Sequence, residues 1–196
     1  MIQRAPEVRA AHLKLLVAAL ATELGGPRAE AVRALVPAWI LRRIEAAARL
    51  DWLPVDYLVA LCDAVEQRAE GDLERWGAGI LRVLLQSPLV RAAYETTIAL
   101  SRRDPAVVVP RLLVAWPLLY SGCGDLVVAE TSPGAVRLVQ AKVPPALRRA
   151  STVRPLVGAL GAIPADCGLE GGAEAEWSPD SSRFVYVIRW RPDRAP

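Results

Sequence analysis

The chain has 196 residues, enough for a single domain with a sizeable core, and its 24 basic and 21 acidic residues leave a net charge of only +3. Because these charges are spread along the chain, we expect no nucleic acid among its partners. Hydrophobic residues make up 53% and the mean hydropathy is +0.25, yet no apolar run approaches the roughly 18 residues that a membrane helix needs. We therefore exclude a transmembrane segment and expect the excess apolar surface to face a partner, a second copy of the chain or an internal cavity.

The start of the chain does not resemble a secretory signal. Residues 1–6 lack the charged start, the apolar core and the small-residue cleavage site of a signal peptide. Cys62, Cys123 and Cys167 are widely spaced, which suits reduced thiols better than a disulfide framework. Both features predict a cytoplasmic protein.

The first 120 residues show helical periodicity and no convincing strand. Pro6 is placed at a first helical position, and Pro37 should bend the second helix because it removes a backbone donor. The helix that begins at Pro105 is apolar almost all round, so we expect it to be central in the fold. The expected helices cover residues 6–24, 27–50, 54–70, 73–86, 89–101 and 105–117.

After residue 124 the apolar period changes to two, which indicates strands. A Ser-Pro-Gly sequence at 132–134 separates the segments 126–131 and 135–143. Proline presets φ and glycine accepts positive φ, so this sequence is typical of a tight turn. The two segments are therefore predicted to form a hairpin.

A helix and a second hairpin should complete the chain. The helix covers residues 144–163, and Pro155 should shorten or bend it. Strands at 173–177 and 183–190 alternate core-type residues with Glu and Arg side chains, which can pair across strands.

The order of these elements predicts an α+β fold, an N-terminal helical bundle followed by a β-β-α-β-β antiparallel sheet unit. The chain contains no internal repeat, low-complexity tract or long linker. Its one seam falls near residue 50. We expect residues 1–49 to form a helical extension packed on a main domain of residues 50–192.

No catalytic, metal-binding or nucleotide-binding motif stands out. His12 is the only histidine and lies far in sequence from every cysteine, so no histidine-activated nucleophile is expected. Cys123 and Cys167 could meet in space, but they are single residues without the close spacing of a ligand set. We therefore expect no enzymatic activity, no metal and no cofactor.

Basic residues cluster on the helix between the two hairpins. Arg148, Arg149 and Arg154, together with Lys142, could hold a phosphate or the acidic surface of a protein partner. The alternative is an ordinary solvated helix face.

Four aromatic residues fall on three helices that should pack together. Trp76, Tyr94, Trp116 and Tyr120 are of the kind that line an apolar pocket with one polar edge, and they are the candidate ligand-binding residues. The alternative is core packing alone.

Turn and packing residues in this chain resemble those of a known superfamily. They comprise Pro54 with Tyr57, Gly77, Asp104-Pro105 with Pro110, residues 133–136, Gly158 with Gly161, and a last strand ending at Trp190. In this order they resemble the superfamily of haem-nitric-oxide-binding domains, V4R domains and Bet3-type subunits of the TRAPP tethering complex, and in particular a family of short, uncharacterised myxobacterial proteins (DUF2378). The resemblance covers about residues 50–192 and implies the α+β fold derived above.

The resemblance has different implications for different ligands. Haem-binding members use a proximal histidine in the helical region, and no histidine follows His12, so the resemblance does not extend to haem. V4R-like members carry cysteines associated with metal, and only Cys123 and Cys167 correspond here. Bet3-type subunits hold an acyl chain in a helical tunnel and assemble through flat helical faces, and both properties are compatible with the apolar excess.

Two hypotheses for function follow. The first is a non-enzymatic signalling adaptor or sensor that acts by dimerisation or by binding a protein partner. The second is a binder of a lipid-like or other apolar small molecule in a helical pocket.

Overall fold

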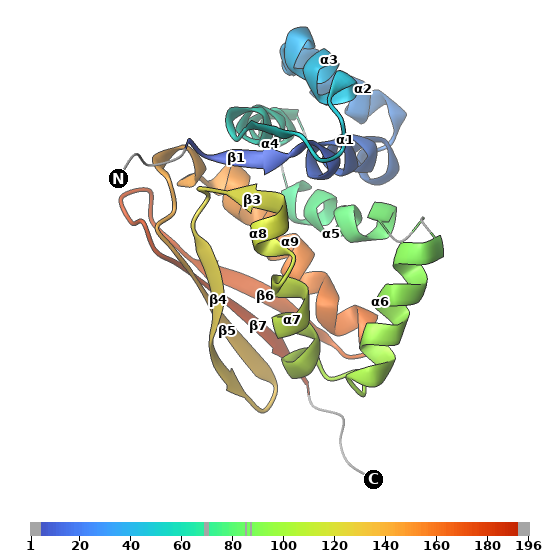
Figure 1. Cartoon of the computed structure of the whole chain (residues 1–196), viewed down its shortest axis with the longest axis vertical. Coiled ribbons are helices and arrows are strands. Elements are labelled where there is room, and N and C mark those ends of the chain that lie inside the picture. Colours follow the sequence, from blue (N-terminus) through green and yellow to red (C-terminus); the bar gives the residue numbers. More distant parts are fainter. Residues whose placement is uncertain (1–4, 69–70, 85, 87, 192–196) are drawn as a thin grey trace.

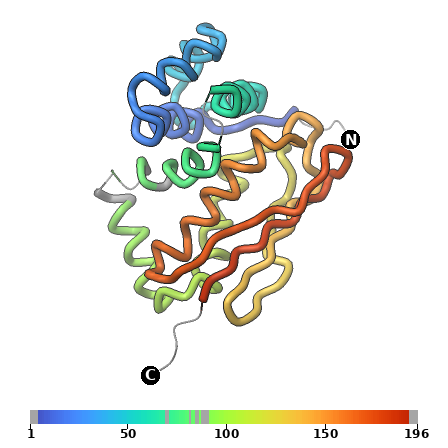
Figure 2. Tube along the Cα trace, turned by 180° about the vertical axis from the view of Figure 1, so that it is seen from behind, coloured from blue at the N-terminus to red at the C-terminus, as the bar shows by residue number. Residues whose placement is uncertain are grey.

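The fold is described by a computed structural model that covers residues 5–68, 71–84, 86 and 88–191. Helices α1 to α5 lie together at one end of the molecule, and the long strands occupy the other (Figure 1). Helix α9 runs along the four-stranded sheet (Figure 2). The helices are α1 (Ala10–Leu24), α2 (Gly26–Leu35), α3 (Ala38–Ala46), α4 (Asp56–Arg68), α5 (Leu73–Leu84), α6 (Pro88–Leu100), α7 (Pro105–Leu113), α8 (Trp116–Leu119) and α9 (Ala150–Asp166).

The described strands form two antiparallel sheets, and the predicted α+β class is confirmed. The larger sheet has the order β4-β5-β7-β6 and the smaller one the order β2-β1-β3. The strands are β1 (Glu7–Arg9), β2 (Trp52–Pro54), β3 (Tyr120–Ser121), β4 (Asp125–Ser132), β5 (Ala135–Ala141), β6 (Gly171–Glu176) and β7 (Phe184–Trp190).

Both predicted hairpins are present. The β4–β5 turn has Gly134 at φ +79°, the conformation for which the sequence provides a glycine. On β7, Phe184, Tyr186 and Ile188 are buried in the main core. The opposite face of the sheet carries a predicted pair between the two strands of the second hairpin, Arg189 with Glu174. Glu176 pairs instead with Arg137 of β5, a contact that was not predicted.

The small sheet corrects the expectation that the first 120 residues contain no strand. Val8 of β1 lies opposite Leu53 of β2 and Tyr120 of β3. Helix α1 consequently begins at Ala10 instead of Pro6, and Pro54 ends a strand instead of opening a helix. Strands of two or three residues are too short to show a period, so the sequence gives no signal for them.

The seam expected near residue 50 falls next to β2, which pairs with β1. One cluster of buried apolar residues includes both Leu13 of α1 and Ile188 of β7. The division into residues 1–49 and 50–192 stays a prediction. Parts of these predictions lie outside the described residues. They are residues 1–4 and 192 of the two units, and residues 69–70 of the helix expected over 54–70.

Two expectations about prolines had different outcomes. Helices α2 and α3 are separated at Pro37, as predicted. In contrast, α9 continues through Pro155 to Asp166, so of the two predicted effects, shortening or bending, the shortening was wrong and the bend stays a prediction. Pro155 is buried against α5, and this packing compensates for the backbone hydrogen bond that the proline cannot make.

The expectation of a central helix at residues 105–117 was also wrong. Val108 and Val109 of α7 are fully buried, and α7 packs on β4 and β5. On its other side Val107 is 39% exposed, and Val114, just after the helix, is 69% exposed. No described element covers this second side, so the all-round apolar pattern reflects an exposed face and not a central position.

Helices α5 and α9 cross in backbone contact. A Cβ atom on Gly77 would collide with the carbonyl group of Pro155, and one on Gly158 would collide with the carbonyl group of Glu74. Only glycine allows so close an approach of two helix backbones. The other side of α9 packs on β6, so this crossing sets the distance between the helical part and the sheet.

We expect Gly77→Ala or Gly158→Ala to lower the free energy of unfolding by roughly 2 to 3 kcal/mol, because the added methyl group forces the two helices apart. Gly26→Ala is the matched control, since a Cβ there meets nothing within 4 Å. Urea unfolding of the three variants measures the difference. Equal stability of Gly77→Ala and Gly26→Ala would contradict the close crossing.

Candidate functional site

The exposed side of α7 and α8 carries three of the large apolar side chains that are exposed on the described surface. Val107, Val114 and Leu118 follow at intervals of seven and four residues, which places them on one side of a helix. Val114 and Ala115 have φ and ψ angles in the right-handed helical region, so only a two-residue turn separates α7 from α8. We call this surface the α7–α8 face; its exposed members are Val107, Pro110, Arg111, Val114, Ala115, Pro117 and Leu118.

The chain fixes both ends of α7. Asp104 accepts a hydrogen bond from the backbone N–H of Ala106 at 2.9 Å, and Pro105 occupies the first turn, where its missing N–H costs nothing. Arg111, the one charged member of the α7–α8 face, donates to the Ser101 hydroxyl at 2.7 Å. The hydrogen bond between Arg111 and Ser101 therefore attaches the α7–α8 face to the end of α6.

Aromatic side chains in contact with one another attach α8 to the rest of the fold. The indole N–H of Trp116 donates to the carbonyl oxygen of Gly124 at 2.9 Å, and its ring stacks on Tyr120 with 4.2 Å between centroids. The Tyr120 hydroxyl and Nε2 of His12 are joined by a hydrogen bond of 2.7 Å. Burial lowers the pKa of His12 to about 4 and raises the pKa of Tyr120, so both groups are neutral at pH 7.

The four aromatic residues predicted as a ligand site do not all lie together. Trp116 and Tyr120 stack on each other, whereas Trp76 is fully buried and donates to the carbonyl oxygen of Leu16 at 3.0 Å. Tyr94 donates to a carboxylate oxygen of Asp166 at 2.8 Å. His12 was not predicted to join this set; its only sequence signal was its uniqueness.

The predicted basic cluster is engaged within the protein. Arg149 pairs with Asp63 of α4 at 2.9 Å, and Arg154 pairs with Glu74 of α5, also at 2.9 Å. Arg148 donates to the carbonyl oxygen of Val143 at 2.9 Å. Arg149 and Arg154 thus link α9 to α4 and α5, and their role toward a partner stays a prediction. Lys142, grouped with them in the sequence, pairs with Asp125 at 2.8 Å.

The described residues contain no group of three or more His, Cys, Asp or Glu side chains that could hold a metal ion. The thiols of Cys62, Cys123 and Cys167 are free and buried. Burial raises the pKa of Cys123 to about 11, and its Sγ lies 3.4 Å from the carbonyl oxygens of Glu7 and Ser121. Burial raises the pKa of Cys62 and Cys167 as well, which favours the protonated thiol at neutral pH.

No family model matches the chain, and no curated protein does. Solved structures do match over nearly the whole length. The H-NOX protein from K. algicida in its unliganded Fe(II) form is 9% identical, with a TM-score of 0.64 over 96% of this chain and 99% of that one. The chain has the H-NOX fold.

Two further H-NOX structures agree with this assignment. The H-NOX protein from S. oneidensis in the Fe(II)NO ligation state is 10% identical, with a TM-score of 0.61 over 94% of this chain and 99% of that one. An oxygen-binding H-NOX domain related to soluble guanylate cyclases is 12% identical, with a TM-score of 0.60 over 91% and 93% of the two chains. At such identities the likeness extends to the fold alone. Among the described residues, no helix of this H-NOX fold is long and apolar enough to cross a membrane.

We expect His12 to make the protein sensitive to acid. Its pKa is 6.5 in the unfolded chain and about 4 in the fold, so between these values only the unfolded chain binds the proton. Above pH 6.5 neutral His12 makes its full contribution to the free energy of unfolding. As the pH falls toward 4 this contribution is lost, and the loss is about 3 kcal/mol at most.

Urea unfolding at pH 7 and pH 4.5 measures this effect. In His12→Gln, which keeps a hydrogen-bond acceptor for Tyr120, the loss between the two pH values should be about 2 to 3 kcal/mol smaller than in the wild type. The same loss in both proteins would show that His12 is not buried in its neutral form.

Proposed function

We propose that this chain is a non-enzymatic adaptor or sensor domain that acts by protein association through the α7–α8 face, with pairing of two copies as its simplest form. The observation that carries the proposal is the exposure of Val107, Val114 and Leu118 along one side of two successive helices. Full burial of a Val or Leu side chain contributes about 1.5 to 3 kcal/mol, so an aligned set of three is a substantial driving force for association.

The composition of the face supports this proposal. Interfaces have apolar centres depleted in charge, with Arg as the charged residue that is enriched there. The α7–α8 face has this composition, since Arg111 is its single charge and Pro110 and Pro117 add further apolar surface. The buried side of α7 and the anchored Trp116 keep the face rigid, which lowers the entropy lost on association.

Haem and gas binding, named for several of the matched H-NOX proteins, are not part of the proposal. A haem iron commonly takes a histidine or a cysteine thiolate of the protein as its axial ligand, and the described residues leave neither in a form ready to bind it. His12 is the only histidine, and its Nε2 is engaged by Tyr120. No histidine occurs on α6 or α7, and the buried thiols have raised pKa values. The residues of this chain therefore do not fit the group.

The test is the double variant Val114→Asp/Leu118→Asp, analysed by native mass spectrometry and sedimentation. We expect the wild type to form a dimer, and the dissociation constant of the variant to rise at least ~100-fold, because each copy would place two carboxylates in the interface. The variant should keep the far-ultraviolet circular dichroism spectrum of the wild type, since both side chains are exposed in the single chain, and only the stability gained from dimerisation should be lost.

Leu50→Asp/Val127→Asp is the matched control, because these two exposed apolar residues lie outside the face. A wild type that stays monomeric at high micromolar concentration would contradict self-association. A dimer that persists in Val114→Asp/Leu118→Asp would show that the interface lies on another part of the protein.

A further inference from the structure

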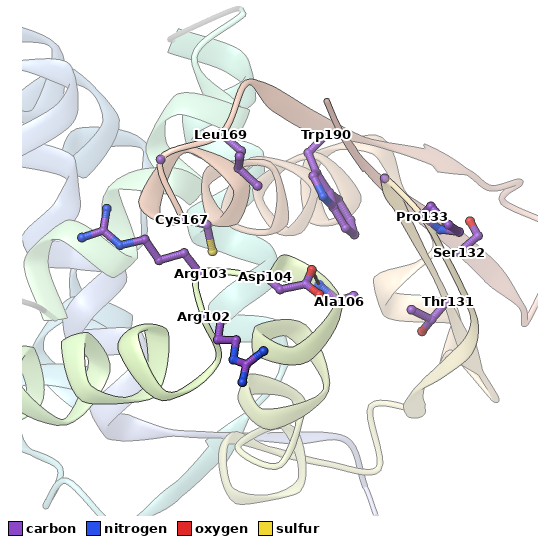
Figure 3. A pocket seen from close by; sticks show the side chains of 12 residues that line it. Arg102, Arg103, Asp104, Ala106, Thr131, Ser132, Pro133, Cys167, Leu169 and Trp190 are labelled. Atoms are coloured by element: carbon purple, nitrogen blue, oxygen red, sulfur yellow. Dashed lines mark hydrogen bonds between the residues drawn. The ribbon is translucent and has the colours of Figure 1, made fainter. Parts of the chain in front are cut away.

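A hollow of about 660 Å³ lies between the start of α7, the β4–β5 turn, and the ends of α9 and β7. Figure 3 shows the indole ring of Trp190 and the thiol of Cys167 projecting into it. The guanidinium groups of Arg102 and Arg103 point in different directions away from Trp190. Since these side chains do not converge, we assign no ligand to the hollow.

A different kind of surface lies on α3, at one end of the long axis of the molecule (Figure 1). The inner side of this helix packs on α1, and Ile40 and Ile44 belong to the main core. We call its outer side the α3 surface; the exposed residues of the helix are Ala38, Trp39, Arg42, Arg43, Glu45 and Ala46. Trp39, Arg42, Arg43 and Ala46 follow at helical spacing, so they share one side.

Trp39 is the one aromatic residue among the large apolar side chains exposed on the described surface, and 54% of it is exposed. Its ring meets the ring of Tyr57 of α4 edge to face, with 5.5 Å between the centroids. Tyr57 thus supports one side of the indole, and the rest of the indole is open to solvent. Trp and Tyr rings are enriched where proteins meet the boundary between lipid and water.

The balance of charge favours the end of the molecule that contains α3. Residues 1–50, which include α1 to α3, carry eight basic and four acidic side chains, whereas residues 51–196 carry 16 and 17. Of the four acids, Glu23 is buried and bound by Arg82, and Glu45 is the only one on α3. The guanidinium groups of Arg42 and Arg43 make no hydrogen bond or ion pair with a described residue. Both charges are therefore available to an anionic partner.

We propose that the α3 surface docks the protein on the anionic surface of a lipid bilayer. The indole of Trp39 enters the boundary between head groups and acyl chains, and Arg42 and Arg43 bind the phosphate and carboxylate groups of the lipids beside it. The position of α3 at the end of the long axis lets it approach a flat surface first (Figure 1). This proposal goes beyond the proposed function and does not depend on it.

Sedimentation of the whole chain with large vesicles is the test. One set of vesicles consists of phosphatidylcholine with about 30% phosphatidylserine, and the other of phosphatidylcholine alone. We expect binding to the anionic vesicles that weakens as added salt screens the charges, and at least ~10-fold weaker binding to the neutral vesicles. Absence of binding to the anionic vesicles, or equal binding to both kinds, would overturn the proposal.

Arg42→Gln/Arg43→Gln should weaken binding to the anionic vesicles at least ~10-fold, because each arginine near such a surface is attracted to it. Arg102→Gln/Arg103→Gln removes the same charge from an adjacent exposed pair beside the hollow and should bind as the wild type does. Circular dichroism checks that both variants are folded. Unchanged binding in Arg42→Gln/Arg43→Gln would show that these arginines do not hold the lipid.

Trp39→Ala should also weaken binding and should remove a blue shift of tryptophan emission that the wild type shows on the anionic vesicles. Leu100→Ala, which truncates an exposed apolar side chain at the end of α6, is the matched control and should keep both. Polyglutamate offers the charge of an acidic protein without acyl chains, so we expect Trp39→Ala to bind it as the wild type does. Binding of polyglutamate that depends on Trp39, without binding to anionic vesicles, would assign the α3 surface to an acidic protein and overturn the proposal.

Discussion

The close crossing of α5 and α9 at Gly77 and Gly158 is the constraint on which the rest of the structure depends. It places the sheet at a fixed distance from the helical part, because α9 packs on α5 with one side and on β6 with the other. Ion pairs from Arg149 and Arg154 hold the same crossing from the side. Helix α1 then packs on α5, where the buried carboxylate of Glu23 is bound by Arg82. Ion pairs on the surface add little to the free energy of unfolding. We therefore infer that the pairs of Arg149 and Arg154 orient the helices, and that the close packing of α5 on α9 stabilises the crossing.

In this H-NOX fold several polar and aromatic groups of the interior are buried or bonded to one another. Trp76 is fully buried, Tyr120 and His12 bond to each other, and the three cysteines are protonated within the core. Two features of the surface adjoin α7. Its N-terminal end borders the hollow with Trp190, and its exposed side carries the apolar face with Val114.

The sequence predicted the elements in which a periodic pattern extends over many residues. It missed the elements that are too short to show a period. The first hairpin has a clear turn sequence and the second has a last strand that alternates over eight residues, so both were predicted correctly. Strand β1 has three residues, and its partner Tyr120 is more than 100 positions away, so nothing local marks it. Periodicity reports how apolar a helix is but not what covers it, which is why the helix at Pro105 was expected to be central. The hollow was missed because its parts come from four separate segments, and the positive φ of Arg102 and Arg103 occurs without a glycine to mark it.

The most direct measurement on this fold is a haemin titration of the purified protein, read by absorption with and without a reductant and nitric oxide. With His12 engaged by Tyr120, haemin should give only a broad spectrum without defined stoichiometry, identical in the wild type and in His12→Gln. A one-to-one complex with a sharp Soret band that shifts with nitric oxide would contradict this expectation and show that the chain binds haem. Loss of that band in His12→Gln would identify His12 as the iron ligand and make the chain a haem sensor.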